Sequence, residues 1–179
     1  MDKIKQYILL LKKWNKKINL VQANTIHTVM DRHIADSARI KDLIPNNYKV
    51  IDIGSGAGLP GVILSIYGIE NIELCEKNFK KAVFLREVKR ELDLNYDIYT
   101  EDIYKHPPFS NDNVVAVSRA FGSLDKLLDV MQRLNINYGI FHKGVTYQEE
   151  IDKALEKYNF KYEISNGTKN GVIVSVRWP

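Results

Sequence analysis

The chain has 179 residues, of which 45% are hydrophobic and 27% are charged, and its formal net charge is +4 at pH 7. These values predict one globular domain over residues 1–179 with an ordinary core. The one cysteine, Cys75, excludes an internal disulfide, and the apolar segment 9–11 is too short to cross a membrane. With no signal peptide expected, the sequence favours a reducing cytoplasm.

Lysines crowd the amino terminus, where apolar residues at helical spacing predict a short amphipathic helix over residues 4–11. The lysines are Lys3, Lys5, Lys12, Lys13, Lys16 and Lys17. A basic end on a nearly neutral body favours a polyanionic partner, with RNA as the leading candidate. A solvated helix face is the equally weighted alternative.

The remaining elements alternate between helices and strands. A second helix is predicted from Asn24 or Thr25 to Leu43, so that residues 1–45 form a basic helical region and residues 46–179 form the rest of the domain. Strands are predicted over 50–53, 69–75, 96–100, 114–117, 140–142, 160–164 and 172–178, and helices over 60–66, 79–92, 124–134 and 148–158. This order predicts an α/β fold with a parallel sheet that is covered on both faces and made mixed by a closing hairpin.

Residues 49–61, Lys-Val-Ile-Asp-Ile-Gly-Ser-Gly-Ala-Gly-Leu-Pro-Gly, are the most informative segment. An apolar strand carrying one acid, Asp52, leads into Gly54, Gly56 and Gly58, and Pro60 then opens a helix. This layout lets a nucleotide-like ligand touch bare backbone. The alternative is a tight turn without a ligand. The G-x-G-x-G spacing differs from the dinucleotide fingerprint and resembles the first motif of class I S-adenosylmethionine-dependent methyltransferases.

Two further acids follow the next two strands. Glu76 stands about 20 residues after the glycines, where an acid can accept hydrogen bonds from both ribose hydroxyls of an adenosine ligand. Its alternative is a surface charge paired with a nearby lysine. Asp102 follows the third strand. The resemblance to class I methyltransferases implies a polar residue at this place, near the adenine amino group of the cofactor. A simple helix cap is almost as strong an interpretation of Asp102.

An ordered set of short motifs carries a more specific resemblance. The motifs are Trp14-Asn15 with Asn19-Leu20, His33-Ile-Ala-Asp36-Ser37, the segment 52–61, Lys80-Lys81 with Phe84-Leu85, Ser118-Arg119-Ala120, and Lys143-Gly144. From Trp14 to about Gly144 the chain resembles the RsmG family, also called GidB. The resemblance implies a Rossmann-like class I methyltransferase fold with a mostly parallel seven-stranded sheet and a short helical extension at the amino terminus.

The same resemblance implies an activity. The family transfers a methyl group from S-adenosylmethionine to N7 of a guanine in the 530 loop of 16S ribosomal RNA (nucleotide 527), leaving S-adenosylhomocysteine. The expected partner is 16S rRNA or the small ribosomal subunit, and a cytoplasmic monomer without a metal is expected. Guanine N7 carries a lone pair and no proton, so the reaction needs alignment and no general base.

The resemblance also implies roles for individual residues. The expected cofactor-binding residues are Asp52, Gly54, Ser55, Gly56, Gly58, Leu59, Pro60, Glu76, Asp102, Ile103 and Arg119. The expected catalytic residues are Arg119 and Lys143. The expected RNA-binding residues are Lys12, Lys13, Lys16, Lys17, Arg32 and His33.

Arg119 is the leading candidate for gripping guanine O6, because it follows the fourth strand, where α/β proteins place their ligands. Its alternative is an ion pair with Asp36, Asp52 or Glu101. Lys143 stands similarly after the fifth strand, where it would contact RNA or the cofactor pocket.

Histidines give little support for a metal. His33, Asp36 and Ser37 share one helix face, interpreted as packing over the cofactor loop, and make a weak metal set. His27, His106 and His142 show no partner spacing that gives them a role.

The sequence departs from the family pattern in places. Thr100–Tyr104 lacks an arginine that is usually followed two residues later by glutamate, and Asn113 stands where an aspartate is usual. The chain is also shorter at both ends than typical members of the family. A methyltransferase for another RNA or a small molecule, and a non-catalytic RNA-binding assembly factor, are the alternative functions.

Overall fold

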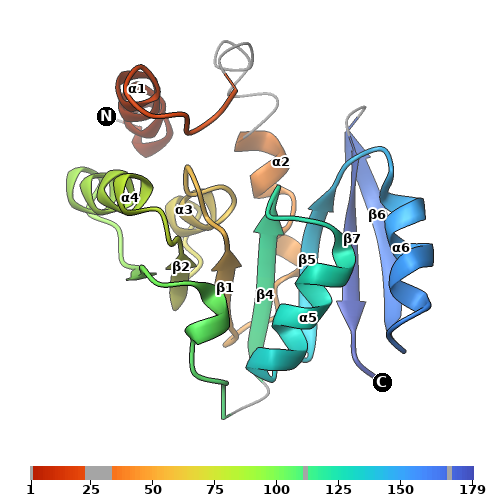
Figure 1. Cartoon of the computed structure of the whole chain (residues 1–179). Coiled ribbons are helices and arrows are strands. Elements are labelled where there is room, and N and C mark those ends of the chain that lie inside the picture. Colours follow the sequence, from red (N-terminus) through yellow and green to blue (C-terminus); the bar gives the residue numbers. More distant parts are fainter. Residues whose placement is uncertain (1, 23–33, 111–112, 169–170) are drawn as a thin grey trace.

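A mixed sheet forms the centre of the computed structural model, which describes residues 2–22, 34–110, 113–168 and 171–179 (Figure 1). The strands are β1 (Lys49–Ile53), β2 (Ile72–Cys75), β3 (Asp97–Tyr99), β4 (Val114–Arg119), β5 (Tyr138–Lys143), β6 (Lys161–Thr168) and β7 (Gly171–Arg177). They lie in the order β3-β2-β1-β4-β5-β7-β6, and among these described strands β7 runs in the direction opposite to the other six. The predicted mostly parallel, seven-stranded sheet with a closing hairpin is confirmed.

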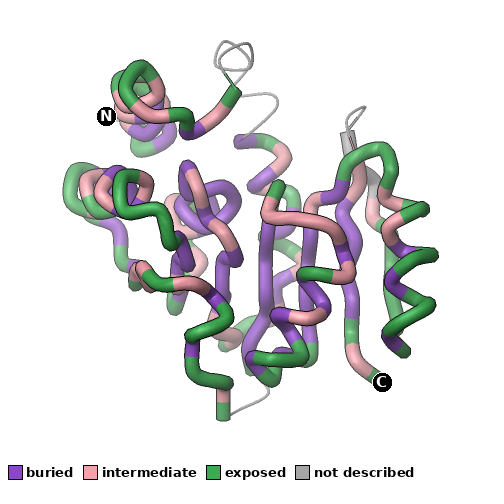
Figure 2. Tube along the Cα trace, viewed as in Figure 1, coloured by how far each residue is buried: buried purple, intermediate pink, exposed green. Residues whose placement is uncertain are grey.

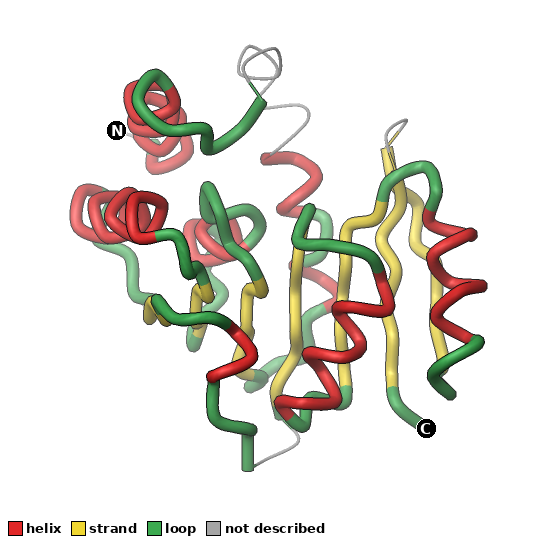
Figure 3. The backbone as a smooth tube through the Cα atoms, viewed as in Figure 1, coloured by secondary structure: helices red, strands yellow, loops and turns green. Residues whose placement is uncertain are grey.

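Helices cover both faces of this sheet (Figures 1 and 3). They are α1 (Lys3–Asn15), α2 (Ala35–Ala38), α3 (Gly61–Ile66), α4 (Phe79–Glu91), α5 (Leu124–Leu134) and α6 (Tyr147–Leu155), with short 3-10 helices η3 (Lys41–Leu43) and η4 (Ile103–Lys105). Alternate residues of a strand point to opposite faces, so Val115 and Val117 pack with α1, α3 and α4, whereas Val114 and Ala116 pack with α5 and α6. Buried positions accordingly line both sides of the sheet (Figure 2).

The carboxyl ends of the parallel strands meet at one edge of the sheet. β1 runs directly into the glycine loop, β2 into Glu76, and β4 ends at Arg119, which lies opposite His142 of β5. Every candidate residue that follows a parallel strand in the sequence is therefore brought to this one edge, as parallel topology requires.

The predicted second helix is broken. Its first residues lie outside the described part of the chain, and the remainder forms only α2 and η3. One carbonyl inside the predicted helix and the carbonyl at its predicted end both accept hydrogen bonds from the sheet. The Asp36 oxygen lies 2.6 Å from His142 Nε2, and the Tyr138 hydroxyl donates to the Leu43 oxygen at 3.1 Å.

The second strand is shorter than predicted, because residues 69–71 end α3 and turn the chain. The Ile69 amide donates to the Leu64 carbonyl at 3.0 Å, and Asn71 has a left-handed φ of 55°. Across the described ranges, no helix is long and apolar enough to cross a membrane.

Candidate cofactor and active site

The glycine loop leaves open space beside one of its three glycines. Gly54, Gly56 and Gly58 have φ values of 71°, 56° and 83°, a region that side chains rarely adopt. A Cβ atom on Gly56 would approach only the Gly54 carbonyl oxygen, at 3.8 Å. A Cβ on Gly54 would lie 2.4 Å from Phe121, and one on Gly58 would lie 2.2 Å from Val62. Close packing therefore explains two of the glycines, and bare, accessible backbone is found at Gly56.

Glu76 lies directly against this bare backbone. Its side chain is buried, Oε2 accepts a hydrogen bond from the Gly56 amide at 2.8 Å, and Oε1 accepts one from the Asn78 amide at 2.7 Å. The ion pair with a nearby lysine, which was the alternative for Glu76, is not found in the part of the chain that the structure describes. Lys77 instead pairs with Asp102 at 2.9 Å. Each carboxylate oxygen has further lone pairs, so Glu76 can accept additional hydrogen bonds from a ligand beside the loop.

Asp52 fastens the loop from below. It is fully buried in β1, and its Oδ2 accepts a hydrogen bond from the Gly61 amide at 2.9 Å, at the start of α3. The Ser55 hydroxyl donates to the Asp52 main-chain oxygen at 3.0 Å. Oδ1 is buried and has no hydrogen-bond partner among the described residues, and burial raises the pKa of Asp52 to about 7. This geometry gives Asp52 and Ser55 a supporting place under the loop, and their contact with a cofactor stays a prediction.

Leu59, Pro60 and Ile103 are buried. The Leu59 amide closes the glycine loop by donating to the Ser55 carbonyl at 3.2 Å, and Ile103 belongs to the core beneath α5. The contact of these three residues with a cofactor also stays a prediction.

Asp102 caps η4 through Oδ1, which accepts a hydrogen bond from the Tyr104 amide at 3.2 Å. The hydrogen bond from Lys77 holds the pKa of Asp102 below its usual value. The helix-cap interpretation is therefore present in the structure. Because Asp102 is partly exposed at the end of β3, its predicted contact with the adenine amino group remains open to test.

Arg119, Asp36 and His142 form a connected cluster where β4 and β5 end. Arg119 Nη2 lies 3.8 Å from Asp36 Oδ2, so the ion pair with Asp36, one of the three alternatives weighed from the sequence, is present. The main-chain oxygen of Asp36 lies 2.6 Å from His142 Nε2. Burial lowers the pKa of His142. No local pattern points to His142, because its partner is a backbone atom more than 100 residues away.

Lys143 is buried among protein partners. Its ammonium donates to the Gly122 carbonyl at 2.7 Å and lies 2.6 Å from Glu150 Oε2, which also accepts a hydrogen bond from the Leu124 amide at 2.8 Å. Lys143 therefore ties β5 to the beginnings of α5 and α6. The catalytic role expected for Lys143 stays a prediction, and Glu150, its partner, was missed because nothing in the sequence pairs the two.

The predicted RNA-binding residues fall into two groups. Arg32 and His33 lie outside the described residues. The remaining four are exposed on the last turn of α1 and just beyond it, namely Lys12, Lys13, Lys16 and Lys17.

The helix that carries these lysines is fixed to the glycine loop. The buried Tyr7 hydroxyl donates to the Ala57 carbonyl at 2.8 Å. Trp14 packs on Phe84 of α4 with ring centroids 5.8 Å apart, as an anchor to the core. The basic helix thus lies beside the candidate cofactor site.

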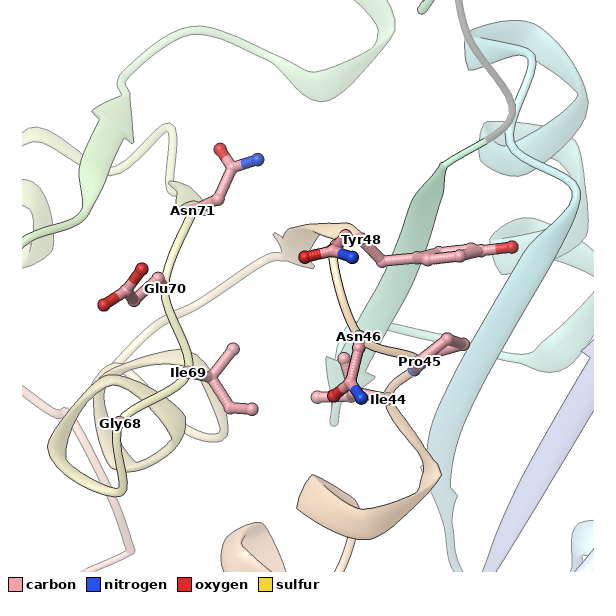
Figure 4. A pocket seen from close by; sticks show the side chains of 9 residues that line it. Ile44, Pro45, Asn46, Tyr48, Gly68, Ile69, Glu70 and Asn71 are labelled. Carbon is pink, nitrogen blue, oxygen red and sulfur yellow. The ribbon is translucent and has the colours of Figure 1, made fainter.

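A surface hollow of about 660 Å³ lies at the opposite edge of the sheet (Figure 4). It is lined by the segments that precede β1 and β2, including Asn46, Tyr48 and Glu70. Ligands of α/β proteins bind at the carboxyl ends of the strands, so this hollow is not the candidate site. Within the described residues, no three histidine, cysteine, aspartate or glutamate side chains group as metal ligands.

Comparisons with known proteins identify relatives of this chain. Residues 1–173 match the family model described as GidB, rRNA small subunit methyltransferase G. The chain is 36% identical over 166 residues to the ribosomal RNA small subunit methyltransferase G of Rickettsia rickettsii (strain Sheila Smith), covering 92% of this chain and 85% of that protein.

Two solved structures share the fold. The 16S rRNA methylase RmtB has a TM-score of 0.63 at 17% identity, over 98% of this chain and 73% of that one. The magnesium protoporphyrin IX methyltransferase ChlM from Synechocystis PCC 6803, solved with bound SAM, has a TM-score of 0.66 at 11% identity, over 96% of each chain. The fold is therefore that of class I S-adenosylmethionine-dependent methyltransferases. By its family match and its close relatives, the chain belongs to the GidB family, rRNA small subunit methyltransferase G.

Proposed function

We propose that this protein transfers a methyl group from S-adenosylmethionine to N7 of a guanine in the 530 loop of 16S ribosomal RNA (nucleotide 527). The observation that carries the proposal is the family match over residues 1–173, on a chain whose glycine loop leaves bare backbone at Gly56 beside the buried Glu76. Relatives of this family are named for methylation of small-subunit ribosomal RNA, and the guanine and its N7 are what the family resemblance implies.

The cofactor would be held by the loop and by Glu76. The open side of Gly56 admits a ligand against the backbone, and the free lone pairs of the Glu76 carboxylate accept hydrogen bonds from two ribose hydroxyls. Tyr7 and Asp52 support the loop from α1 and β1. When bound, S-adenosylmethionine supplies an electrophilic methyl group on a positively charged sulfur.

The protein's part in the chemistry is alignment. Guanine N7 has an available lone pair, so no side chain has to remove a proton, and rate enhancement comes from holding the reacting atoms in line. Arg119, at the end of β4 beside Asp36, would donate hydrogen bonds to guanine O6 and leave N7 free to accept the methyl group.

The basic end of α1 would bind RNA phosphates. Lys12, Lys13, Lys16 and Lys17 are exposed on a helix that contacts the glycine loop, so bound RNA would lie near the cofactor. The proposed partner is 16S rRNA or the small ribosomal subunit, engaged by a cytoplasmic monomer that needs no metal.

The test is a methyl-transfer assay with purified protein, methyl-labelled S-adenosylmethionine and small subunits from a strain that lacks the corresponding gene. Mass spectrometry of the RNA should find one methyl group, on N7 of the 530-loop guanine. Arg119→Ala should reduce turnover by roughly a hundredfold while leaving cofactor affinity unchanged, and the exposed Arg177→Ala provides a matched loss of charge.

Other outcomes contradict the proposal. A methyl group on a different RNA or a small molecule would establish a methyltransferase of another specificity. Absence of cofactor binding at millimolar concentration would favour the non-catalytic assembly factor.

A further inference from the structure

His142 links β5 to α2 through a hydrogen bond to backbone. Its Nε2 lies 2.6 Å from the Asp36 carbonyl oxygen, and because a carbonyl oxygen can only accept, Nε2 must carry the proton. Burial favours the neutral ring; nearby Arg119 and Arg39 act in the same direction, whereas Asp36 acts against them. The neutral ring with its proton on Nε2 is therefore the form that makes this contact.

Asp36 faces two partners at once. Its main-chain oxygen contacts His142, and its carboxylate lies 3.8 Å from the Arg119 guanidinium. Arg119 and His142 are register partners on neighbouring strands, so the three residues close a small circuit between β4, β5 and α2.

The helix that carries Asp36 needs outside support. α2 has four residues and no side-chain hydrogen bond at its N-cap, and a single turn is not stable by itself in water. The placement of the Asp36 carboxylate therefore depends on tertiary contacts such as the one with His142.

The second ring nitrogen of His142, Nδ1, makes no hydrogen bond within the described part of the chain that would explain the residue. Nδ1 is buried and has no hydrogen-bond partner among the described residues. An unsatisfied buried acceptor destabilises a fold, so an apolar side chain would serve the sheet better at this position. The hydrogen bond from Nε2 to the Asp36 carbonyl therefore explains a histidine at position 142 better than packing does.

We propose that His142 is a positioning residue for methyl transfer: by holding the Asp36 main chain it keeps the Asp36 carboxylate beside Arg119 and so orients the guanidinium toward the guanine. This inference rests on the proposed function, in which Arg119 grips the base. His142 itself does not touch the substrate in this account.

The experiment is a double-mutant cycle on the full-length protein. His142→Leu should lower kcat by about tenfold, because displacing a positioning group by a fraction of an ångström is costly, while cofactor affinity stays within about twofold. His142→Gln should retain most activity, because its side-chain amide can donate to the same carbonyl. In an Arg119→Ala background, His142→Leu should have no further effect, measured in single-turnover reactions with enzyme in excess.

Additive effects of the two substitutions would overturn the inference, as would a glutamine variant as slow as the leucine variant. A second measurement does not depend on methylation. The ring nitrogen shifts of His142 at pH 7.5, measured by NMR, should show a proton on Nε2 and none on Nδ1. An active wild type with the other tautomer contradicts this inference alone, whereas an inactive wild type with the expected tautomer contradicts the proposed function and with it the role of Arg119.

Discussion

Gly56 is the residue on which the cofactor site depends most directly, and its substitution gives the first prediction. Gly56→Val should abolish binding of S-adenosylmethionine, because the new side chain would occupy the open space beside the loop. Isothermal titration calorimetry measures this loss, and the variant should give no heat of binding at cofactor concentrations that saturate the wild type.

Gly68→Val is the matched control for backbone strain. Gly68 also has a left-handed φ, 85°, and no atom lies within 4 Å of its added Cβ. Both variants should lose about 1–2 kcal/mol of stability from the left-handed conformation. If Gly56→Val binds the cofactor as tightly as Gly68→Val does, the pocket is not at this glycine.

Glu76 gives the second prediction. Glu76→Ala should weaken cofactor affinity by about 1–3 kcal/mol, the scale of losing hydrogen bonds to a charged acceptor. Glu73→Ala, on the strand that leads to Glu76, removes the ion pair with Lys49 and the hydrogen bond with His106, and should lower thermal stability without changing cofactor affinity. Equal affinity of both variants for the cofactor would remove Glu76 from the site.

The free energy of unfolding should depend on pH through the ionisation of Asp52. Its pKa in the folded protein is about 7, above its ordinary value of 3.8, so the folded protein holds an extra proton between these pH values. The contribution of Asp52 to stability is therefore greatest below about pH 4 and is lost as the pH rises to about 7. Asp52→Asn should gain about 2–3 kcal/mol relative to the wild type between pH 5 and pH 8.

Urea unfolding of the cofactor-free protein at several pH values measures this gain. Asp125→Asn is the control, because a hydrogen bond from Ser123 lowers the pKa of Asp125 and keeps its titration below this window. A difference between Asp52→Asn and the wild type that stays constant from pH 5 to pH 8 would show that Asp52 is ionised throughout.

At the scale of elements, the exposed lysines of α1 should carry part of the RNA affinity. The double variant Lys12→Gln/Lys16→Gln should weaken binding and reduce the slope of log affinity against log salt by about 1.4, at about 0.7 per phosphate contact on single strands. The equally exposed pair Lys153→Gln/Lys161→Gln, on α6 and β6, removes the same charge. Identical salt slopes for the two double variants would leave the α1 lysines with a role in solubility alone.

Elements with strong local patterns could be predicted from the sequence, and those set by tertiary contacts could not. β1 and the glycine loop follow from an apolar run ending in spaced glycines, and α5 follows from its repeating leucines. The second helix was predicted as continuous from a cap at Asn24 or Thr25 to Leu43. Hydrogen bonds from His142 and Tyr138 to its backbone act over about 100 residues and leave no trace in local spacing.

The candidate site divides in the same way. Glu76 was identifiable because its distance from the glycines fixes its place beside them, and the hydrogen bond to Gly56 agrees with that place. Lys143 was predicted to face a ligand because it ends a strand, but its ammonium is engaged by Glu150 and Gly122. The direction of a side chain at the end of a strand depends on the helices that pack there. Local sequence patterns do not predict that packing.

At the scale of the whole molecule, the sheet topology brings distant segments to one edge. The glycine loop, Glu76 and Arg119 lie at the ends of three parallel strands. Helix α1 contacts the glycine loop through the hydrogen bond from Tyr7 to Ala57. The residues proposed to hold the cofactor, the base and the RNA backbone are thus spread along the chain, and the elements that carry them meet at the edge where the parallel strands end (Figure 1).

The central claim is that this edge binds S-adenosylmethionine at Gly56 and Glu76, and a crystal structure with S-adenosylhomocysteine tests it most directly. We expect the ligand against the Gly56 backbone, with its ribose hydroxyls about 2.7 Å from the Glu76 carboxylate. A glycine loop left empty at millimolar ligand, or a nucleoside bound at another edge of the sheet, would contradict it.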